Sequence, residues 1–367
     1  MSKFYSGVPI LSEGECLPWW LPEMYGARIK RVNIPKAARC HPLRFQALIR
    51  ANRFLPSGFS RSDYTHRIFH LFDAWAAKQV LKLKPRIVVG YENSSSKTFL
   101  AAKSIGAYCV LDASSLHHKS IASLLNFPNT NYLSEIVRRK EAEVESSDLI
   151  ITCSPWARES FIENGVPADK VRSILLGSEL PKGIPAWKKG KGPVRFIFAG
   201  GIRHLKSIDI ILDAFNRLYE EGFRYSLTFV GGGGDADLLG RIQKTPLASR
   251  HKNLPQPALY SRFADSDCLL LPSRFDSFGM VVAEAMACGT PAIVSTNTGS
   301  KSIIEKFPGS GWIVEPTVDS LYEKLRELLI DPEILYCARA RALEASGCFT
   351  WQAYRARVRE TFKEIFP

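Results

Sequence analysis

Two carboxylates, Asp276 and Glu284, stand eight residues apart around the expected start of a helix. The segment 271–291 reads LPSRFDSFGMVVAEAMACGTP, in which a strand ends at Pro-Ser, a loop carries Asp276, and a helix begins near Gly279. Backbone N–H groups at a helix start bind anions such as phosphate. Glu284 comes about one and a half turns into that helix, so its carboxylate can face the same ligand. The segment therefore predicts a site for an anionic ligand.

A second group of candidate residues lies at 198–206, where the sequence reads FAGGIRHLK. Gly200 and Gly201 let the backbone approach a ligand closely, because they carry no Cβ atom. Arg203 and Lys206 can neutralise a diphosphate that departs with its charge. These residue types favour a phosphate-bearing ligand whose leaving group is a diphosphate.

A run of four glycines follows an apolar stretch at 225–230, in the sequence VGGGGDA. It satisfies a loose dinucleotide-binding fingerprint. That fingerprint belongs after the first strand of its domain, whereas this run lies well inside one. No acidic residue ends a following strand to hold a ribose. The run alone is therefore weak evidence for a dinucleotide cofactor.

The elements around these residues alternate between short β-branched runs and amphipathic helical patterns. We expect strands at 86–90, 108–112, 149–153, 194–198, 225–230, 267–271 and 292–295. We expect helices at 64–83, 97–106, 131–147, 207–221, 279–287, 320–329 and 351–365. Such alternation is typical of βαβ units and parallel sheets, which bind ligands outside the carboxyl ends of their strands.

The alternation is interrupted at 181–193, a stretch rich in proline, glycine and lysine that suits neither helix nor strand. The chain of 367 residues is long enough for two domains. We expect an N-terminal domain at 1–180, a linker at 181–193, a second domain at 194–350 and a C-terminal helix at 351–367. The fold class is α/β.

The segment PSRFDSFGMVVAEAMACGTPA resembles the signature of glycosyltransferase family 4, a pattern like PSxxEGFGxxxxEAMAxGxPV. One departure from the pattern matters for the chemistry, because Asp276 stands where the family has Glu and holds its carboxylate one methylene further back. The resemblance implies the GT-B fold, with two Rossmann-like domains facing a central cleft and a C-terminal helix that crosses back to the N-terminal domain. It also implies retaining transfer of a sugar from a nucleotide-diphospho-sugar, without an essential metal or other cofactor.

The same resemblance assigns roles to the residues of the second domain. Asp276 contacts the transferred sugar, Glu284 bridges the ribose hydroxyls, and amides near Gly279 and Met280 hold the distal phosphate. Lys206 stabilises the leaving diphosphate, and Asp276 and Lys206 are expected to be catalytic together with His117. The expected donor-binding residues are Glu284, Gly200, Gly201, Arg203, Ser277, Phe278, Gly279, Met280, Val281, Gly231 and Gly232.

Two of these positions depart from the family's pattern. The family usually has an Arg directly after the first glycine, where this chain has Gly201, and a Lys-Gly pair where this chain has Lys206-Ser207. Arg203 either substitutes for the missing Arg or is a surface cation. The glycine loop with Gly231 is expected near the nucleotide base.

Candidates for the acceptor side lie in the first half of the chain. The family often places a His near the reacting sugar after a strand, and His117 and His118 follow the strand at 108–112. We prefer His117 for that role; the alternative is a histidine that only packs. Glu92 and Asn93 follow the preceding strand, and Gly7 is the one candidate for a glycine turn near the N terminus.

The charge of the chain is concentrated in its first part. The net charge is +13, and residues 1–100 hold 16 basic and six acidic side chains. This favours docking to an anionic partner such as a membrane surface, and the alternative is solubility alone. The aromatic stretch 16–25 fits a lipid interface, a core or an acceptor cleft. No aromatic RNA-binding signature or basic recognition helix indicates nucleic acid.

No run of 18 or more apolar residues and no secretory signal is present in the sequence, so we expect a cytoplasmic protein. Peripheral docking at the inner face of the membrane stays open. The predicted function is transfer of a sugar to a saccharide or lipid-linked acceptor in surface glycan or polysaccharide synthesis. The alternatives are a nucleotide-sugar hydrolase or epimerase of the same fold, and a non-catalytic basic binding protein.

Overall fold

The computed structural model describes residues 3–5, 10–11, 30–31, 38–40, 43–51, 61–125, 131–181 and 192–366. The predictions for Gly7 and for the aromatic stretch 16–25 lie outside these residues. By its internal contacts the chain divides into two compact units. The first unit is Met1–Asp112 with Pro128–Ile150, and the second is Ala113–Phe127 with Ile151–Pro367. Residues 113–127 and 151–180 therefore group with the second half of the chain.

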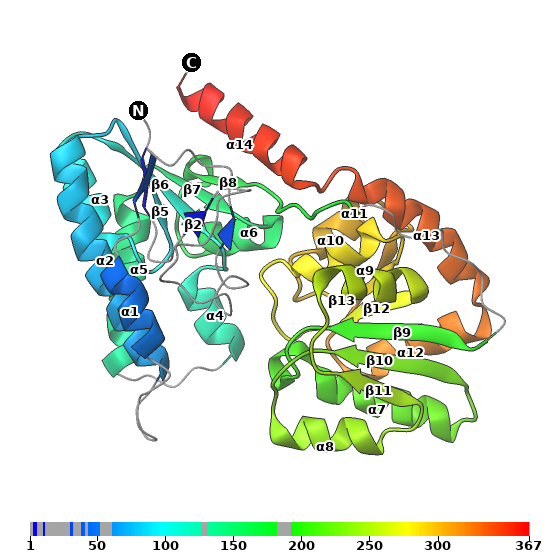
Figure 1. Cartoon of the computed structure of the whole chain (residues 1–367). Coiled ribbons are helices and arrows are strands. Elements are labelled where there is room, and N and C mark those ends of the chain that lie inside the picture. Colours follow the sequence, from blue (N-terminus) through cyan, green and yellow to red (C-terminus); the bar gives the residue numbers. More distant parts are fainter. Residues whose placement is uncertain are drawn as a thin grey trace. The chain divides into compact units, whose positions relative to one another are not determined.

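The first unit combines short strands with packed helices (Figure 1). Its elements are β1 (Phe4–Tyr5), β2 (Ile10–Leu11), β3 (Lys30–Arg31), β4 (Arg39–Cys40), α1 (Leu43–Ala51), α2 (Arg61–Leu83), β5 (Ile87–Tyr91), α3 (Ser96–Ser104), β6 (Tyr108–Ala113) and α5 (Asn131–Ser146). Helix α3 packs against α2 and α5. Strands β5 and β6 pair in parallel, in a four-stranded sheet of order β5-β6-β7-β8 with β7 (Leu149–Thr152) and β8 (Val171–Ser173).

The second unit contains the remaining elements. In chain order they are α4 (His118–Leu125), α6 (Pro155–Glu163), η4 (Ala168–Lys170), β9 (Val194–Ala199), η5 (His204–Lys206), α7 (Ile208–Glu220), β10 (Tyr225–Val230), α8 (Ala236–Lys244), β11 (Ala248–His251), α9 (Gln256–Asp265), β12 (Cys268–Leu271), α10 (Met280–Ala287), β13 (Ala292–Ser295), α11 (Lys301–Lys306), β14 (Gly311–Val314), α12 (Val318–Ile330), α13 (Glu333–Ser346) and α14 (Trp351–Ile365).

The six-stranded sheet of the second unit has the order β11-β10-β9-β12-β13-β14, and all its pairs are parallel. Counted from β9, this is the order 3-2-1-4-5-6 of a Rossmann sheet. Figure 1 shows α7, α8 and α12 on one face and α9, α10 and α13 on the other. The chain leaves β9 and β12 towards opposite sides, which makes their carboxyl ends the topological switch point where such sheets bind ligands.

The predicted strands and helices have counterparts in the structure within a few residues. Strands β12 and β13 are buried along their whole length, as continuous apolar runs in a two-sided parallel sheet should be. The sequence analysis missed the edge strands β8, β11 and β14 and the two-residue strands β2, β3 and β4. It also missed α1, α4, α6, α8, α9, α11 and α13. In β11 the residues Ala-Ser-Arg-His carry little β-branched character, because an edge strand needs fewer apolar residues.

Helix α14 begins where the sequence predicts it. The Thr350 hydroxyl accepts a hydrogen bond from the Ala353 N–H and caps the helix. The residue before the cap is held by Ser178, whose N–H donates to the Phe349 carbonyl at 2.8 Å. The expectation that this helix crosses back to the N-terminal domain stays a prediction, as does the central cleft. Among the described residues, no helix is long and apolar enough to cross a membrane.

Candidate active site

Lys206 and Asp276 meet at the switch point of the Rossmann sheet. Lys206 ends the single turn η5 after β9, and Asp276 lies in the loop after β12. The Lys206 Nζ atom donates to Asp276 Oδ2 at 2.6 Å, and the two side chains are 25% and 20% exposed. The sequence analysis predicted both as catalytic, and the structure brings their charged groups into contact.

The loop that carries Asp276 is held along its length by the segment 297–300. The Asp276 N–H donates to the Asn297 carbonyl at 3.1 Å, and the Gly299 N–H donates back to the Asp276 carbonyl at 2.9 Å. The Ser300 N–H donates to the Phe278 carbonyl at 2.6 Å. Gly299 is required here because a Cβ atom would overlap the Ser277 carbonyl oxygen. The Asp276 backbone is therefore fixed before any ligand binds.

Helix α10 begins directly after this loop. Gly279 adopts a left-handed φ of +83°, and an added Cβ would lie 2.7 Å from the side chain of Leu271. Within the described parts of the chain, no side chain caps the helix start. Met280 and Val281 are half-buried, while the Phe278 side chain lies in the hydrophobic core. The first N–H groups of α10 therefore fit the predicted phosphate contact, as anion donors at a helix start.

Glu284 lies on α10, one turn after its start, and is half-buried. Burial raises the pKa of Glu284. Among the residues that the structure describes, none donates a hydrogen bond to its carboxylate. The neighbouring Tyr260 hydroxyl accepts a hydrogen bond from Gln256 Nε2 at 2.7 Å, and its pKa is raised by burial and by the Glu284 charge. A desolvated carboxylate without an internal donor suits the hydroxyl groups of a ligand.

Glycines occur in the loops after β9 and β10 because the backbones of these loops pack closely. A Cβ on Gly231 would overlap the Gly200 carbonyl oxygen, and one on Gly232 would overlap the Asn253 amide. Gly200 itself has a φ of +153°. This packing gives the glycines a structural reason, and their contact with a donor stays a prediction.

Arg203 lies over Gly201. Its Nε atom is 3.7 Å from the position that a Gly201 Cβ atom would occupy. Arg203 is exposed, so its guanidinium stays accessible beside the glycine loop. The geometry favours Arg203 as the substitute for the Arg that the family has at position 201, although its contact with a ligand stays a prediction.

Ser277 contacts residues from the end of the first sheet. Its hydroxyl lies 3.0 Å from the Ser115 hydroxyl, and its carbonyl accepts a hydrogen bond from the Ser154 hydroxyl at 2.9 Å. These contacts lie within the second unit. They occupy the Ser277 carbonyl, so the predicted donor contact would depend on its other groups.

His117 and His118 both lie in the second unit and are both buried. The His117 N–H donates to the Ser160 hydroxyl at 2.9 Å, and its ring stands edge-on to Phe161 at 5.1 Å between ring centroids. The ring of His118 lies 4.2 Å from that of His117. This packing agrees with the structural alternative for the pair, and the role of His117 near a reacting sugar stays a prediction.

Glu92 and Asn93 lie at the end of β5 in the first unit. The Glu92 carboxylate pairs with Lys140 Nζ at 2.7 Å. The Asn93 N–H donates to Glu143 at 2.6 Å, and its side-chain amide contacts His66 Nδ1 at 2.6 Å. Both acceptor-side candidates thus have internal partners, and their contact with an acceptor is untested.

Two charged residues that the sequence analysis did not single out, Arg274 and Asp209, lie beside the Lys206–Asp276 pair. The Arg274 guanidinium pairs with both carboxylate oxygens of Asp209 at 2.7 Å. Arg274 stands inside the motif at 271–291, two residues before Asp276. This position, so close to a predicted catalytic residue, is the sequence signal that could have identified Arg274 as a candidate.

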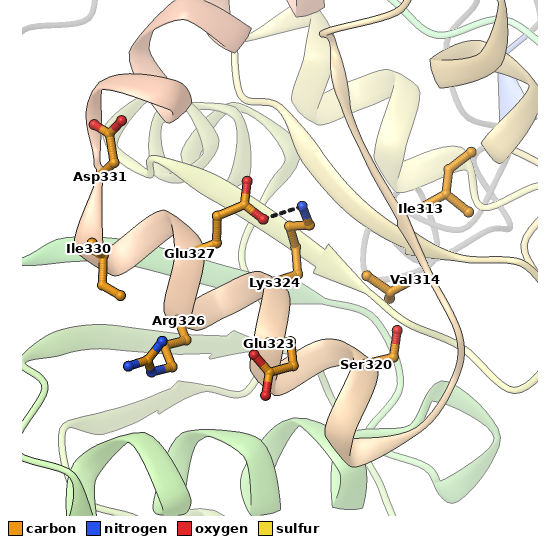
Figure 2. Close-up of a pocket in the computed structure, with 9 residues that line it drawn as sticks. All are labelled: Ile313, Val314, Ser320, Glu323, Lys324, Arg326, Glu327, Ile330 and Asp331. Atoms are coloured by element: carbon orange, nitrogen blue, oxygen red, sulfur yellow. Dashed lines mark hydrogen bonds and ion pairs between the residues drawn. The ribbon is translucent and has the colours of Figure 1, made fainter.

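The structure contains a pocket that lies apart from these residues. Its volume is about 710 Å³, and Figure 2 shows that its lining side chains come mainly from α12 and β14. They are Ile313, Val314, Ser320, Glu323, Lys324, Arg326, Glu327, Ile330 and Asp331, and none of them is a predicted site residue. Lys324 and Glu327, which both lie on α12, pair with each other beside the pocket. The mixed charges give this pocket no evident ligand.

No cluster of three metal-ligating side chains occurs within the described parts of the chain. Lys206 and the start of α10 place positive charge at the site by themselves. The independence from metal that the resemblance implies stays a prediction.

The chain contains two parallel β-sheets with flanking helices, and the Lys206–Asp276 pair lies at the switch point of the second sheet. These features define an α/β protein of the GT-B fold. Solved structures of that fold resemble the chain: sucrose-phosphate synthase from Thermosynechococcus elongatus has a TM-score of 0.61 at 17% identity, over 92% of this chain and 83% of that one. HepE of Anabaena, solved in complex with UDP, has a TM-score of 0.62 at 16% identity, over 79% of this chain and 81% of that one.

Residues 182–344 match the family described as glycosyl transferases group 1. A D-inositol 3-phosphate glycosyltransferase of Catenulispora acidiphila is 31% identical over 169 residues, which cover 42% of this chain and 40% of that protein. The chain spans 40% to 60% of the length of such curated relatives. The matched segment contains the signature at 271–291, on which the resemblance to glycosyltransferases rests.

Proposed function

We propose that the protein is a retaining glycosyltransferase that moves a sugar from a nucleotide-diphospho-sugar to a saccharide or lipid-linked acceptor. Within the group 1 transferases, the motif at 271–291 favours family 4. The observation that carries the proposal is the contact between Lys206 Nζ and Asp276 Oδ2 at 2.6 Å, at the switch point and beside the uncapped start of α10.

Each of these groups has a task in such a reaction. The N–H groups at the start of α10 bind the distal phosphate, and the Glu284 carboxylate accepts hydrogen bonds from the ribose hydroxyls. Lys206 stabilises the negative charge that grows on the diphosphate as the sugar leaves. Asp276 orients the hydroxyls of that sugar once the donor phosphates engage Lys206.

Retention of configuration would follow from attack on the same face as the leaving group. The departing phosphate would take the proton of the acceptor hydroxyl, so no covalent nucleophile is assigned. The names of the relatives support a sugar-transfer reaction, since they include a D-inositol 3-phosphate glycosyltransferase and a glycogen synthase. The nucleotide UDP in the HepE structure supports a nucleotide donor.

The first experiment is a thermal-unfolding screen with UDP, GDP, ADP and CMP and their sugar conjugates. A ligand that binds only the folded state raises the melting temperature by mass action. We expect one diphosphate to stand out, and Glu284→Ala to abolish its shift. The matched control is Glu305→Ala, because Glu305 is exposed on α11. The same shift in melting temperature with every nucleotide, or no shift with any of them, would contradict the proposal.

A second experiment separates transfer from the alternatives. Donor consumption is measured with and without a panel of saccharides and lipid-linked sugars. A transferase consumes donor mainly when an acceptor is present. Acceptor-independent release of the free sugar would identify a hydrolase, and conversion of the donor sugar without release would identify an epimerase. A non-catalytic binding protein would bind the nucleotide and consume nothing.

The basic first part of the chain supports a lipid-linked acceptor, a role in surface glycan synthesis and a cytoplasmic protein at the inner membrane face. Residues 1–100 carry a net charge of +10, which should attract anionic headgroups. We expect the protein to sediment with anionic vesicles at low salt and to be released as salt screens the charges. Equal sedimentation with neutral vesicles would reject docking by charge.

A further inference from the structure

We propose that Arg274 is a positioning residue for the transfer step, because it clamps the turn that carries Lys206 onto the loop that carries Asp276. The proposal rests on the proposed function, since Lys206 is the group that Arg274 would position. Nothing in the motif at 271–291 assigns Arg274 a role, and it does not itself pair with Lys206 or Asp276.

Arg274 holds the η5 turn through both its backbone and its side chain. Its N–H donates to the Leu205 carbonyl at 3.1 Å. Its Nη1 atom donates to the His204 carbonyl at 2.7 Å. His204 and Leu205 are the first two residues of the three-residue turn that ends in Lys206. One residue thus joins the backbone of the Lys206 turn to the strand-end loop that bears Asp276.

Asp209 fixes the guanidinium from the other side. Nη1 and Nη2 of Arg274 donate to the two carboxylate oxygens of Asp209, each at 2.7 Å, which is a bidentate geometry. Burial alone would raise the pKa of Asp209, but the hydrogen bonds and charge of Arg274 outweigh it and the net shift is downward. Asp209 lies in the first turn of α7, so Arg274 ties the turn, the loop and this helix together.

The turn needs such support because it is short and ends in an unfavourable conformation. A single 3₁₀ turn has weak hydrogen-bond geometry. Ser207, which follows Lys206, has a left-handed φ of +56° that costs a non-glycine residue energy. If the turn relaxed, the Lys206 ammonium would move relative to Asp276. A misplacement of about 1 Å at a reacting group lowers a rate on the order of 100-fold.

The first test measures the position of Lys206 without any reaction. The wild type and Arg274→Gln are labelled with acetic anhydride, and the rate at Lys206 is followed by mass spectrometry. We expect Lys206 to react about threefold faster or more in the variant, because a loosened turn releases it from Asp276. The control is Arg341→Gln, since Arg341 forms an exposed ion pair with Glu344 on α13. An unchanged rate at Lys206 would overturn the clamp.

The second test is a double-mutant cycle in turnover. We expect Arg274→Gln to lower kcat by about 100-fold while the donor KM changes by less than about threefold. In a Lys206→Ala background the same change should cost less than about threefold, because the group being positioned is gone. An equal loss in both backgrounds would show a general structural role and overturn the proposal. A rise in KM with unchanged kcat would make Arg274 a donor contact instead.

Arg274→Lys keeps the charge but lacks the planar fork that reaches His204 and Asp209 together. We expect this variant to stay close to Arg274→Gln in kcat, and full recovery by lysine would overturn the bidentate clamp. A wild type that consumes no nucleotide sugar would reject the proposed function. In that case the labelling rate at Lys206 alone decides whether Arg274 holds the turn.

Discussion

Two helices of this protein, α3 and α10, start directly after a parallel strand, yet their starts are used in opposite ways. At α3 the chain supplies its own anions. Asp73 of α2 accepts hydrogen bonds from the N–H groups of Lys97 and Thr98, at 2.9 and 2.8 Å. Glu143 of α5 accepts from the N–H groups before the helix. At α10 no side chain from the part of the chain that the structure describes caps the start.

The ion pairs near the two helix starts also differ, because those near α3 are more deeply buried than the one near α10. Near α3, Arg139 pairs with Asp73 at 2.7 Å and Lys140 pairs with Glu92 at 2.7 Å. None of these four side chains is more than 16% exposed. Near α10, Lys206 and Asp276 pair with each other while partly exposed. The same strand-loop-helix geometry therefore stabilises helix packing in one unit. In the other unit it leaves a cation, a carboxylate and helix N–H groups available to a ligand.

Removal of Asp73 is the sharpest test of the structural half of this comparison. Asp73 is fully buried, and Asp73→Ala would leave Arg139 buried without its partner and the start of α3 without a cap. We expect a loss of about 3–5 kcal/mol in the free energy of unfolding. The measurement is urea unfolding followed by circular dichroism. The control Asp319→Ala removes an ion pair with Arg217 at an 88% exposed aspartate and should cost less than about 1 kcal/mol.

Removal of Lys206 tests the functional half. We expect Lys206→Ala to lower kcat about 100-fold to 1,000-fold, because the ammonium acts on charge that grows as the diphosphate leaves. The donor KM should change much less. Stability should change little, since the pair with Asp276 is partly exposed. The control Lys306→Ala removes an exposed lysine at the end of α11 and should keep the wild-type kcat. A wild-type kcat in Lys206→Ala would remove the contrast between the two helix starts.

The difference between the two starts could not be predicted from sequence. Residues 92–95 and 272–278 both look like polar strand-end loops, and the sequence analysis took Glu92 and Asn93 as candidates for the acceptor side. Their partners Lys140 and Glu143 come from α5, about 50 positions later in the chain. A spacing pattern within one loop carries no information about such distant partners.

The elements of the fold were predictable because their physical signals are local. Strands β9, β12 and β13 are largely apolar runs, and α7 has a strong apolar stripe. The motif at 271–291 was predictable because its glycine, carboxylate and helix start lie within one segment. Arg274 was missed because its role depends on carbonyl groups of His204 and Leu205, which sequence does not reveal.

Glu284→Ala should change binding and stability in opposite directions. Burial raises the pKa of the Glu284 carboxyl, which receives no hydrogen bond from the described residues, so its ionised form is disfavoured in the folded state. Its contribution to stability therefore falls as the pH rises from the ordinary glutamate range through the raised pKa. We expect the variant to lose this pH dependence and to unfold at a higher temperature at neutral pH.

The same variant should bind the donor nucleotide about 10-fold to 100-fold more weakly, since the ribose hydroxyls lose a charged acceptor. Calorimetry of nucleotide binding and thermal unfolding between about pH 5 and about pH 8 measure the two effects on one sample. A drop in both stability and affinity would identify Glu284 as a structural residue like Asp73. Unchanged affinity would reject the ribose contact.

The smallest expected effect concerns two residues whose backbone is in the left-handed conformation. They are Ser207, which follows Lys206, and Asn93, in the loop after β5. Ser207 has a φ of +56° and a buried hydroxyl without a partner in the described structure, whereas Asn93 has a φ of +63° and holds His66 at 2.6 Å. Glycine relieves the backbone strain at either position. At Ser207 it also removes an unsatisfied hydroxyl, so Ser207→Gly should gain about 1 kcal/mol.

At Asn93 the same glycine removes a buried hydrogen bond, and asparagine already tolerates the left-handed conformation. Asn93→Gly should therefore lose about 1 kcal/mol. Thermal unfolding of the two variants side by side measures the difference in sign. A gain in stability at both positions would mean that backbone strain outweighs side-chain partners at both loops. Opposite signs would mean that the loop after β5 is satisfied by its own partners, while the turn that carries Lys206 keeps strain that only its function explains.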